Sequence, residues 1–506
     1  MINFRRVICP LLLLAAFLQI PFHTQAASQP SRPNIIFILA DDLGYGELGC
    51  YGQQKIKTPN LDRMAREGMR FTRFYAGSTV CAPSRSVLMT GQHTGHTTVR
   101  GNAGATDRSP QMLRSNDVTV AEVLKTAGYR TGLVGKWGLG MNDDGHPTLQ
   151  GFDYFYGYLS QHHAHNHFPD FLWRNRERVK LSNKVTPMGD EGAGYATNAV
   201  EFAGDLLAEE ALDFIEASTN RAEPFFLYFS PVVPHANNER KKALGNGMEV
   251  PDFGPYQDEP WSDALKGHAA MITRLDADIG RLLQKLKLLD IQRNTLVIFS
   301  SDNGPHSEGG QDPEFFDPNG PVRGYKRDFT DGGIRVPFIA WWPGKIQPAT
   351  ANHLAYFGDM MATFSELAGA TSPKNIDSIS IVPTLLRPRT HGGRAVSNVG
   401  PAQRHHHHLY FEFHEGGFSQ AVILDGRWKG IRMKRLDAPI QIYDLHTDPG
   451  ETRDLAATHL SVLKEVELLF RTERTDSPLW PVKEAPLTPK GGATNTRENS
   501  KVTKSL

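Results

Sequence analysis

Short apolar runs of strand length alternate with segments of helical periodicity along most of the chain. The strand-like runs are nearly continuous in apolar residues, as expected of strands that are covered on both faces of a sheet. They lie at residues 33–39, 131–134, 224–230, 295–301 and 336–342. The helical patterns lie at residues 58–68, 120–127, 208–217 and 269–289, the first with Thr58 as its predicted N-cap. This alternation predicts an α/β fold with a large, mostly parallel sheet sandwiched by helices.

The pattern changes beyond about residue 388. Residues 391–403 resemble a linker, and four short runs of strand character then precede a helix. The strands are predicted at residues 409–413, 421–424, 428–433 and 440–443, and the helix at 460–471. We therefore expect a large domain over residues 28–390, a smaller C-terminal α+β subdomain with an antiparallel sheet over 404–490, and a disordered tail over 491–506. The run from His405 to His408 is expected to be a native loop without a metal role.

The N-terminal residues have the pattern of a secretory signal. Arg5 and Arg6 precede an apolar run from Leu11 to Ile20, and small residues follow near Ala27. This predicts a signal peptide over residues 1–27 and an exported protein, periplasmic or secreted. The apolar run is too short for a stable bilayer anchor, and no other segment is longer and as apolar, so no membrane span is expected.

The overall charge and the cysteine count limit which binding partners and disulfide bonds are expected. The 55 basic and 55 acidic residues give a net charge of 0, so no overall field favours nucleic acid as a partner. Removal of the signal leaves Cys50 and Cys81, which are few for an exported protein. A disulfide between them would consume both thiols.

Carboxylates follow two of the predicted strands. Asp41 and Asp42 end the first strand, and Asp302 and Asn303 follow the strand at 295–301. Ligands of open α/β sheets bind at the carboxyl ends of the strands, so these side chains are expected to meet there. Three carboxylates and an amide suit a hard cation such as Ca²⁺. Alternatively, each is a helix cap or turn former.

The segment Cys81-Ala82-Pro83-Ser84-Arg85 precedes a run compatible with a helix. Taken by itself it is also compatible with a buried thiol before a Pro-Ser turn. With the carboxylates it resembles the signature of type I sulfatases, arylsulfatase-like members of the alkaline phosphatase superfamily. The resemblance implies that a formylglycine-generating enzyme oxidises Cys81 to formylglycine, whose hydrate is the nucleophile. A geminal diol can release sulfate through its second hydroxyl, which an encoded serine or cysteine cannot do.

Further residues match the family in chain order. Lys136, in Gly-Lys-Trp-Gly-Leu-Gly, corresponds to a lysine that contacts formylglycine and sulfate. His235 and Lys326 correspond to groups at the leaving oxygen, where an alkoxide needs a proton or a cation. Arg85 lies one turn into the helix, whose first amides and dipole favour an anion.

The resemblance also implies the metal ligands and places them at five positions. Calcium would be held by oxygen donors after the two strands and by residue 81: Asp41, Asp42, Cys81, Asp302 and Asn303.

One position departs from the family. Gly138 stands where many members carry a histidine that serves as the base in sulfate elimination. The loop with His162, His163, His165 and His167 could bring a replacement imidazole into the pocket, and we predict His165 for this role and for substrate binding.

Together with the signal-like N-terminus, the resemblance implies an exported sulfatase acting on a sulfated polysaccharide or glycan. Resemblance to carbohydrate sulfatases with the same Gly-Lys-Trp-Gly-Leu-Gly segment implies a galactose-type ring. Trp173-Arg174 and the stretch from Glu412 to Glu415 are expected to contribute to a polar, sugar-sized pocket. Two alternatives remain open: a phosphoester hydrolase of the same superfamily, and a noncatalytic protein that binds sulfated glycans.

Overall fold

The computed structural model describes residues 32–103, 109–142, 144–189, 192–221, 223–386, 390–391, 394–395 and 401–484. The predicted signal peptide (1–27) and C-terminal tail (491–506) lie outside these residues. Within the described part of the chain, no helix has the length and apolar content needed to cross a bilayer.

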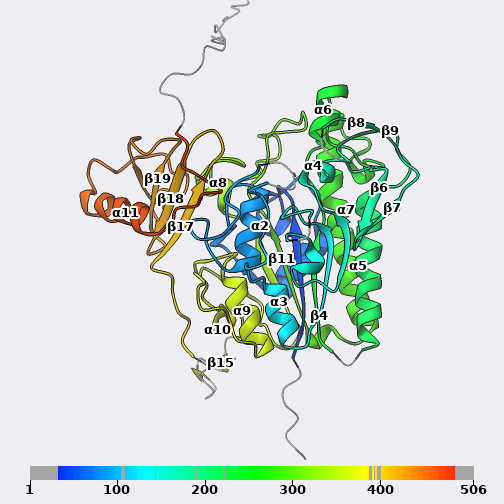
Figure 1. Cartoon of the computed structure of the whole chain (residues 1–506), viewed down its shortest axis with the longest axis horizontal. Helices are drawn as coiled ribbons and strands as arrows, with labels where there is room; N and C mark the ends of the chain where they lie inside the picture. Colours follow the sequence, from blue (N-terminus) through cyan, green and yellow to red (C-terminus); the bar gives the residue numbers. More distant parts are fainter. Residues whose placement is uncertain are drawn as a thin grey trace, which may run out of the picture. The chain divides into compact units, whose positions relative to one another are not determined.

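A ten-stranded mixed sheet forms the centre of the fold (Figure 1). Its strands, in spatial order, are β13 (Ala349–Ala351), β2 (Met69–Phe71), β12 (Phe338–Trp341), β11 (Thr295–Ser301), β1 (Asn34–Ala40), β10 (Phe225–Ser230), β4 (Arg130–Lys136), β5 (Tyr154–Tyr158), β6 (Phe171–Arg174) and β7 (Glu177–Lys180). The five neighbouring strands from β11 to β5 are all parallel. Both flanks include antiparallel pairs, because β12 runs against β11 and β2, and β6 against β5 and β7. The mostly parallel sheet expected from the sequence is confirmed.

Helices cover both faces of this sheet, which explains why its central strands carry apolar residues on both faces. Alternate residues of β1 enter different cores: Ile36 and Ile38 pack on one face, Phe37 and Leu39 on the other. The first face is covered by α1 (Pro59–Glu67), α5 (Ala203–Thr219) and α7 (Asp263–Leu288), and the second by α2 (Cys81–Thr90), α3 (Val120–Thr126) and α9 (Asp359–Ala368).

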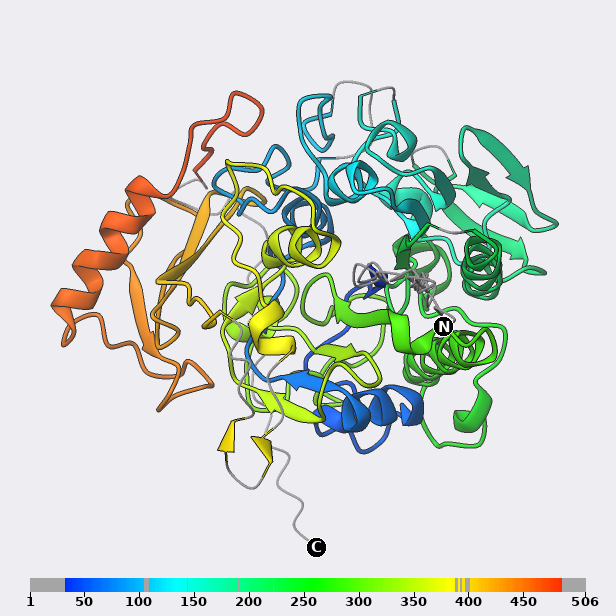
Figure 2. The same ribbon diagram turned by 90° about the horizontal axis from the view of Figure 1, so that it is seen from below.

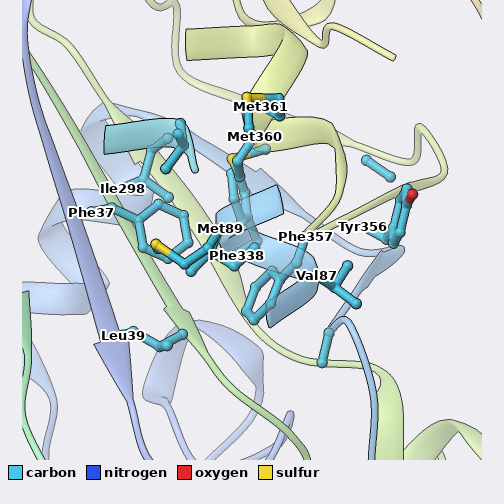
Figure 3. Close-up of a cluster of buried hydrophobic side chains, with 14 of the residues drawn as sticks. Phe37, Leu39, Val87, Met89, Ile298, Phe338, Tyr356, Phe357, Met360 and Met361 are labelled. Carbon is cyan, nitrogen blue, oxygen red and sulfur yellow. The ribbon is translucent and has the colours of Figure 1, made fainter. Parts of the chain in front are cut away.

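The second core fixes the helix that carries Cys81. Val87 and Met89 of α2 belong to the same buried cluster as Phe37 of β1 and Met360 and Met361 of α9 (Figure 3). All ten residues of α2 are buried. The position of the first residue of α2 is therefore set by packing along the whole helix.

A four-stranded antiparallel sheet forms the C-terminal part, again as expected. It consists of β17 (His408–Phe413), β18 (Ser419–Leu424), β19 (Trp428–Arg432) and β20 (Gln441–Asp444), with α11 (Leu460–Thr472) on one face. The sheet and α11, coloured orange to red, lie beside the central sheet in both views (Figures 1 and 2). Phe411 and Ile423 belong to the same core as Phe37, so the two sheets share one hydrophobic core.

The smaller elements are short helices and paired strands on loops. They are α4 (Gln161–Ala164), α6 (Asn238–Leu244), α8 (Asp331–Ile334), α10 (Val382–Leu385), the pairs β3 (Phe74–Tyr75) with β14 (Ala355–Tyr356), β8 (Lys184–Pro187) with β9 (Gly194–Asn198) and β15 (Thr390–His391) with β16 (Arg394–Ala395), and the 3₁₀ turns Gly49–Tyr51, Pro147–Leu149, Gly254–Tyr256 and Gln292–Asn294.

Helix α1 begins as the sequence predicts, with Thr58 at the N-cap and Pro59 as the first helical residue. The Thr58 hydroxyl does not cap the helix, however; it accepts from the Gly49 amide and donates to Asp62. The helix predicted at 269–289 begins six residues earlier, because Ser262 caps it by accepting a bond from the Leu265 amide.

Candidate active site

Two strand ends bring four oxygen-bearing side chains together. Strands β1 and β11 are parallel neighbours, and Ala40 pairs with Ser301 at their ends. The next residues are therefore adjacent: the Asp42 amide donates to Asp302 Oδ1 at 3.1 Å, and Asn303 Nδ2 donates to Asp42 Oδ1 at 2.8 Å. Asp302 and Asn303 are fully buried, as are Asp41 and Asp42. The structure thus assembles the cluster that the strand-end argument anticipated.

Asp42 adopts the left-handed backbone conformation, with φ of 67°. Few residues other than glycine adopt it, and strained backbone of this kind concentrates at functional sites. Here it directs consecutive side chains to different cations, since Asp41 contacts Lys136 and Asp42 contacts Lys326.

Cys81 is the first residue of α2 and lies directly beside this cluster. Its Sγ donates to Asp41 Oδ1 at 3.4 Å, and the residue is almost wholly buried. Burial, together with the Asp302 and Asp41 carboxylates, raises the pKa of the Cys81 thiol well above its usual value. Cys50 and Cys81 are both free thiols, so residue 81 is not consumed in a disulfide.

Arg85 lies one turn further along α2 and is held from several sides. Its Nε and Nη2 donate to Asp302 Oδ2 at 3.1 and 2.8 Å, and its Nη1 donates to the Lys136 carbonyl at 3.0 Å. Tyr228 and Ser230, both on β10, accept further bonds from Nη1. A charge-assisted fork of this kind fixes the guanidinium beside the carboxylates.

Two buried lysines complete the cationic side of the cluster. Lys136, the last residue of β4, places Nζ 2.6 Å from Asp41 Oδ2. Lys326 places Nζ 2.8 Å from Asp42 Oδ2. Although burial opposes it, these carboxylate partners raise the pKa of Lys136 and of Lys326, so both remain charged.

His235 follows β10 and contacts Lys326. Its Nδ1 donates to the Ala236 carbonyl at 2.8 Å, which leaves Nε2 as an acceptor 3.1 Å from Lys326 Nζ. Burial and the Lys326 charge hold the pKa of His235 well below its usual value. A neutral imidazole and a cation therefore stand side by side.

The four histidines at positions 162, 163, 165 and 167 fall into two groups, one that lines the pocket and one that packs behind it. His165 stacks on His235 with ring centroids 4.7 Å apart and an interplanar angle of 15°, and its Nδ1 lies 3.0 Å from Glu239 Oε2. His162 and His165 both line the pocket that contains Cys81. His163 instead packs against Phe171, and His167 bonds the His235 carbonyl.

Gly138 lies close to Gln161, a residue that lines the pocket. Gly138 has φ of 74°, and a Cβ built there would lie 3.1 Å from Gln161 Cγ. Gln161 thus occupies the space into which a larger side chain at position 138 would extend.

The pocket above these groups has a volume of about 150 Å³. It is lined by polar side chains from loops as well as by the predicted site residues: Cys81, Asn102, Gln111, Ser160, Gln161, His162, His165, His235, Asn238, Glu308, Lys326, Arg327 and Glu415. The expectation for Trp173-Arg174 was wrong, because both lie on the flanking strand β6, where Arg174 pairs with Glu210. In the stretch from Glu412 to Glu415, only Glu415 is among the lining residues.

The donors after β1 and β11 fit a hard divalent cation. Asn303 Oδ1 is buried and has no hydrogen-bond partner within the described residues, which is costly for a polar atom unless a ligand satisfies it. Burial and the neighbouring Asp41 carboxylate raise the pKa of Asp302 to about 7. A cation held by Asp41, Asp42, Asp302 and Asn303 would satisfy the free oxygen and offset this repulsion.

His93, His96 and Asp377 form another group of potential ligands in the described part of the chain. However, the two rings are stacked with centroids 4.3 Å apart at 24°, so one metal cannot lie in the plane of both. The Gly95 amide also donates to His93 Nδ1, which puts the ring proton on Nε2, toward Asp377. The hydrogen bond to Asp377 raises the pKa of His96, and the group is explained as an ion pair.

Comparison with known proteins agrees with this site. The family profile described as Sulfatase matches residues 33–370, and the one described as N-sulphoglucosamine sulphohydrolase, C-terminal, matches residues 324–472. N-acetylgalactosamine-6-sulfatase of Rattus norvegicus is 32% identical over 467 residues, covering 86% of this chain and 83% of that protein. N-acetylgalactosamine-6-O-sulfatase of Bacteroides thetaiotaomicron is 30% identical over 522 residues, covering 88% and 93%.

The chain is also similar to a solved structure described under the metabolism of multiple glycosaminoglycans by Bacteroides thetaiotaomicron. The two structures superimpose with a TM-score of 0.67 and share 28% sequence identity, and the match covers 88% of this chain and 100% of that chain. The fold and the buried cations beside the pocket are consistent with a hydrolase whose substrates are anionic esters. The chain belongs to the sulfatase family, as a type I member of the alkaline phosphatase superfamily, and is a sulfuric ester hydrolase.

Sequence reasoning missed several residues of the pocket. Glu308 and Arg327 come from loops without a periodic pattern, and Asn238 begins the short helix α6. Asn102 lies twenty residues beyond Ala82, whose amide donates to it. Glu308 is only five residues beyond Asn303, and Arg327 directly follows Lys326, so proximity to a predicted site residue was the available signal for both.

Proposed function

We propose that this enzyme removes sulfate from a sulfated glycan, with a galactose-type sugar sulfated at O6 as substrate, a formylglycine made from Cys81 and a bound Ca²⁺. The observation that carries the proposal is the position of Cys81. It begins a buried helix, contacts Asp41 and shares one pocket with Lys326 and His235. The names of the relatives support the sugar and the sulfated position.

Formylglycine would supply a hydrate hydroxyl as nucleophile, and Ca²⁺ on the carboxylates would add positive charge beside the sulfate oxygens. Side chains around residue 81 can contribute in two further ways, by accepting a proton and by stabilising negative charge. Asp41 Oδ1, 3.4 Å from Cys81 Sγ, can hold the proton of a hydroxyl at that position. Arg85 and Lys136 offset the charge of the sulfate, because both cations are fixed within the same buried cluster.

Lys326 and His235 would act at the opposite end of the sulfate ester. Both line the pocket, and Lys326 Nζ lies between Asp42 and the His235 ring. A sugar alkoxide is a poor leaving group, so a cation or proton donor at its oxygen lowers the barrier. His165, stacked on His235, is the group that we propose as the base in place of the missing histidine at position 138.

We also propose that the mature enzyme is exported, to the periplasm or beyond the cell, and is matured by a formylglycine-generating enzyme. The support is the signal-like pattern of residues 1–27 and the reduced, unpaired state of Cys81. Comparing the N-terminus of the mature protein with the cell fraction that contains it tests the export.

One experiment tests the central proposal. Protein from its native host is digested, the mass of the peptide with residue 81 is measured, and turnover of N-acetylgalactosamine 6-sulfate is compared with that of the 6-phosphate. The expected result is a peptide with the mass of the aldehyde and sulfate release that stops in Cys81→Ala. An unmodified thiol in active enzyme, or faster release of phosphate than of sulfate, would contradict the proposal.

A further inference from the structure

Glu415 brings the C-terminal sheet to the active-site pocket. It lies in the turn between β17 and β18, and it lines the same pocket as Cys81 and Lys326. Its side chain is 26% exposed. The pocket is therefore built from both sheets, although every predicted catalytic residue belongs to the larger part.

The two carboxylate oxygens of Glu415 have different environments. Oε2 accepts a hydrogen bond from Arg327 Nε at 3.1 Å. Oε1 is buried and has no partner among the described residues. A buried carboxylate oxygen without a donor is costly, so a ligand that offers an O–H or N–H at this point gains the full benefit of pairing it.

A chain of contacts holds Glu415 in place. Arg327 has a left-handed backbone, with φ of 82°, and its Nη1 donates to Glu308 Oε1 at 2.8 Å. Glu308 in turn accepts from Asn238 at 3.0 Å. Arg327 directly follows Lys326, the group proposed at the leaving oxygen, and Glu415 and Lys326 line the same pocket. The acceptor is thus preorganised rather than free to turn into solvent.

The sign of the charge indicates which part of a substrate meets Glu415. A carboxylate repels the sulfate, whereas Arg85, Lys136 and Lys326 attract it. Glu415 is therefore expected to face the neutral sugar on the far side of the ester oxygen. A hydroxyl or an acetamido N–H can donate to it, while a uronate or a second sulfate there would be rejected.

We propose that Glu415 is a positioning residue that accepts a hydrogen bond from an O–H or N–H of the sulfated sugar and so selects the substrate. This inference rests on the proposed function and deepens it. The turn between β17 and β18 becomes a specificity element, and the C-terminal sheet contributes directly to substrate choice.

The test compares two substrates in the enzyme with confirmed aldehyde at residue 81. One is N-acetylgalactosamine 6-sulfate, and the other is 4-nitrophenyl sulfate, which has no sugar. In Glu415→Ala, kcat/KM for the sugar should fall roughly 10- to 150-fold, as expected for a lost hydrogen bond to a charged group. The value for the aryl sulfate should stay within about twofold. Glu415→Gln, which retains an acceptor, should lie between wild type and Glu415→Ala.

A second measurement separates recognition from a merely structural role. Deoxy analogues of the sulfated sugar, each lacking one hydrogen-bond donor, are assayed with wild type and with Glu415→Ala. For one analogue, the loss in kcat/KM with wild type should equal the loss that Glu415→Ala shows with the complete sugar. The losses should then not add, because both remove the same bond. Glu467→Ala, an exposed carboxylate on α11, is the matched control and should match wild type with both substrates.

The outcomes distinguish the two proposals. Equal losses for both substrates in Glu415→Ala, or additive losses with every deoxy sugar, would overturn the role of Glu415 while leaving the proposed function intact. Wild-type enzyme that hydrolyses the aryl sulfate but no sulfated sugar would overturn both.

Discussion

The backbone amide of Asp42 donates a hydrogen bond of 3.1 Å to the side chain of Asp302, although the two residues lie 260 positions apart. The contact follows from the register of β1 and β11, which ends with Ala40 opposite Ser301. It concentrates carboxylates at one point, and buried cations from α2, β4 and the loop before α8 surround them. The stability of this cluster should therefore depend on positive charge.

Calcium is expected to stabilise the protein through this cluster. At a concentration about 100-fold above its dissociation constant, a ligand specific for the native state adds about 2.7 kcal/mol. Thermal unfolding should shift upward with Ca²⁺ and downward with a chelator, and the shift should shrink in Asn303→Ala, which removes the unpaired Oδ1. Asn220→Ala, at the exposed end of α5, should keep the whole shift. An unchanged calcium shift in Asn303→Ala would rule out this residue as a ligand.

Replacing Lys326 should affect leaving groups unequally. Lys326→Met removes the cation beside His235 Nε2, and loss of acid or electrostatic assistance typically costs 10²- to 10⁴-fold. The loss in kcat should be large for a sugar sulfate and small for 4-nitrophenyl sulfate, because nitrophenoxide departs without help. Steady-state kinetics on both substrates measures the ratio. Lys345→Met, an exposed lysine, is the control, and equal losses on both substrates would refute the leaving-group role.

The parallel core and the strand-end carboxylates could be predicted because both leave local patterns. Continuous apolar runs mark strands buried on two faces, and polar residues directly after such runs mark the strand ends, as at Asp41 and Asp302. The antiparallel flanks could not be predicted in the same way. β2 has only three residues, and β12 differs from a parallel strand in direction alone.

The pocket wall depended on contacts that no local pattern encodes. Tyr228 and Ser230 read as ordinary strand residues, yet they bond Arg85. Glu415 was noticed in an acidic stretch, but its neighbour Glu412 proved to be a structural residue paired with Arg100. Such functions arise from tertiary packing of segments hundreds of residues apart.

His165 is expected to be needed for turnover but not for maturation. His165→Asn should retain the aldehyde at residue 81 and lose roughly 10²- to 10⁴-fold in kcat. Burial lowers the pKa of His165, as do the Lys136 and Lys326 charges, whereas Glu239 opposes them. The net shift is downward, so the imidazole is neutral and basic at pH 7.

The pH dependence of kcat distinguishes a base function of His165 from a merely structural one. The acidic limb of kcat should lie below the ordinary histidine value of 6.5. Glu239→Gln removes the carboxylate that favours the protonated ring, so the limb should move to still lower pH. His162→Asn, at the same pocket, should leave its position unchanged. Full activity in both His165→Asn and His162→Asn would exclude the loop as the source of the base.

Glu412 is expected to stabilise the fold away from the active site. Glu412 is fully buried on β17, where it accepts from Arg100 Nη1 at 3.0 Å and from Arg474 Nε at 3.1 Å. Although burial opposes it, the hydrogen bond from His414 and the Arg100 charge lower the pKa of Glu412 to about 2. The folded protein thus binds this proton less readily than the unfolded chain.

A carboxyl whose pKa is depressed on folding contributes stability above its unfolded value of 4.5, and that contribution disappears as the pH falls toward about 2. The shift corresponds to on the order of 3 kcal/mol. In urea unfolding, Glu412→Gln should be less stable than wild type by a similar amount at pH 7, and the difference should shrink as the pH drops below 4.5. Glu467→Gln, on the exposed face of α11, should show little difference at either pH. A gap between wild type and Glu412→Gln that stays constant with pH would show that the charge of Glu412 does not stabilise the junction between the two sheets.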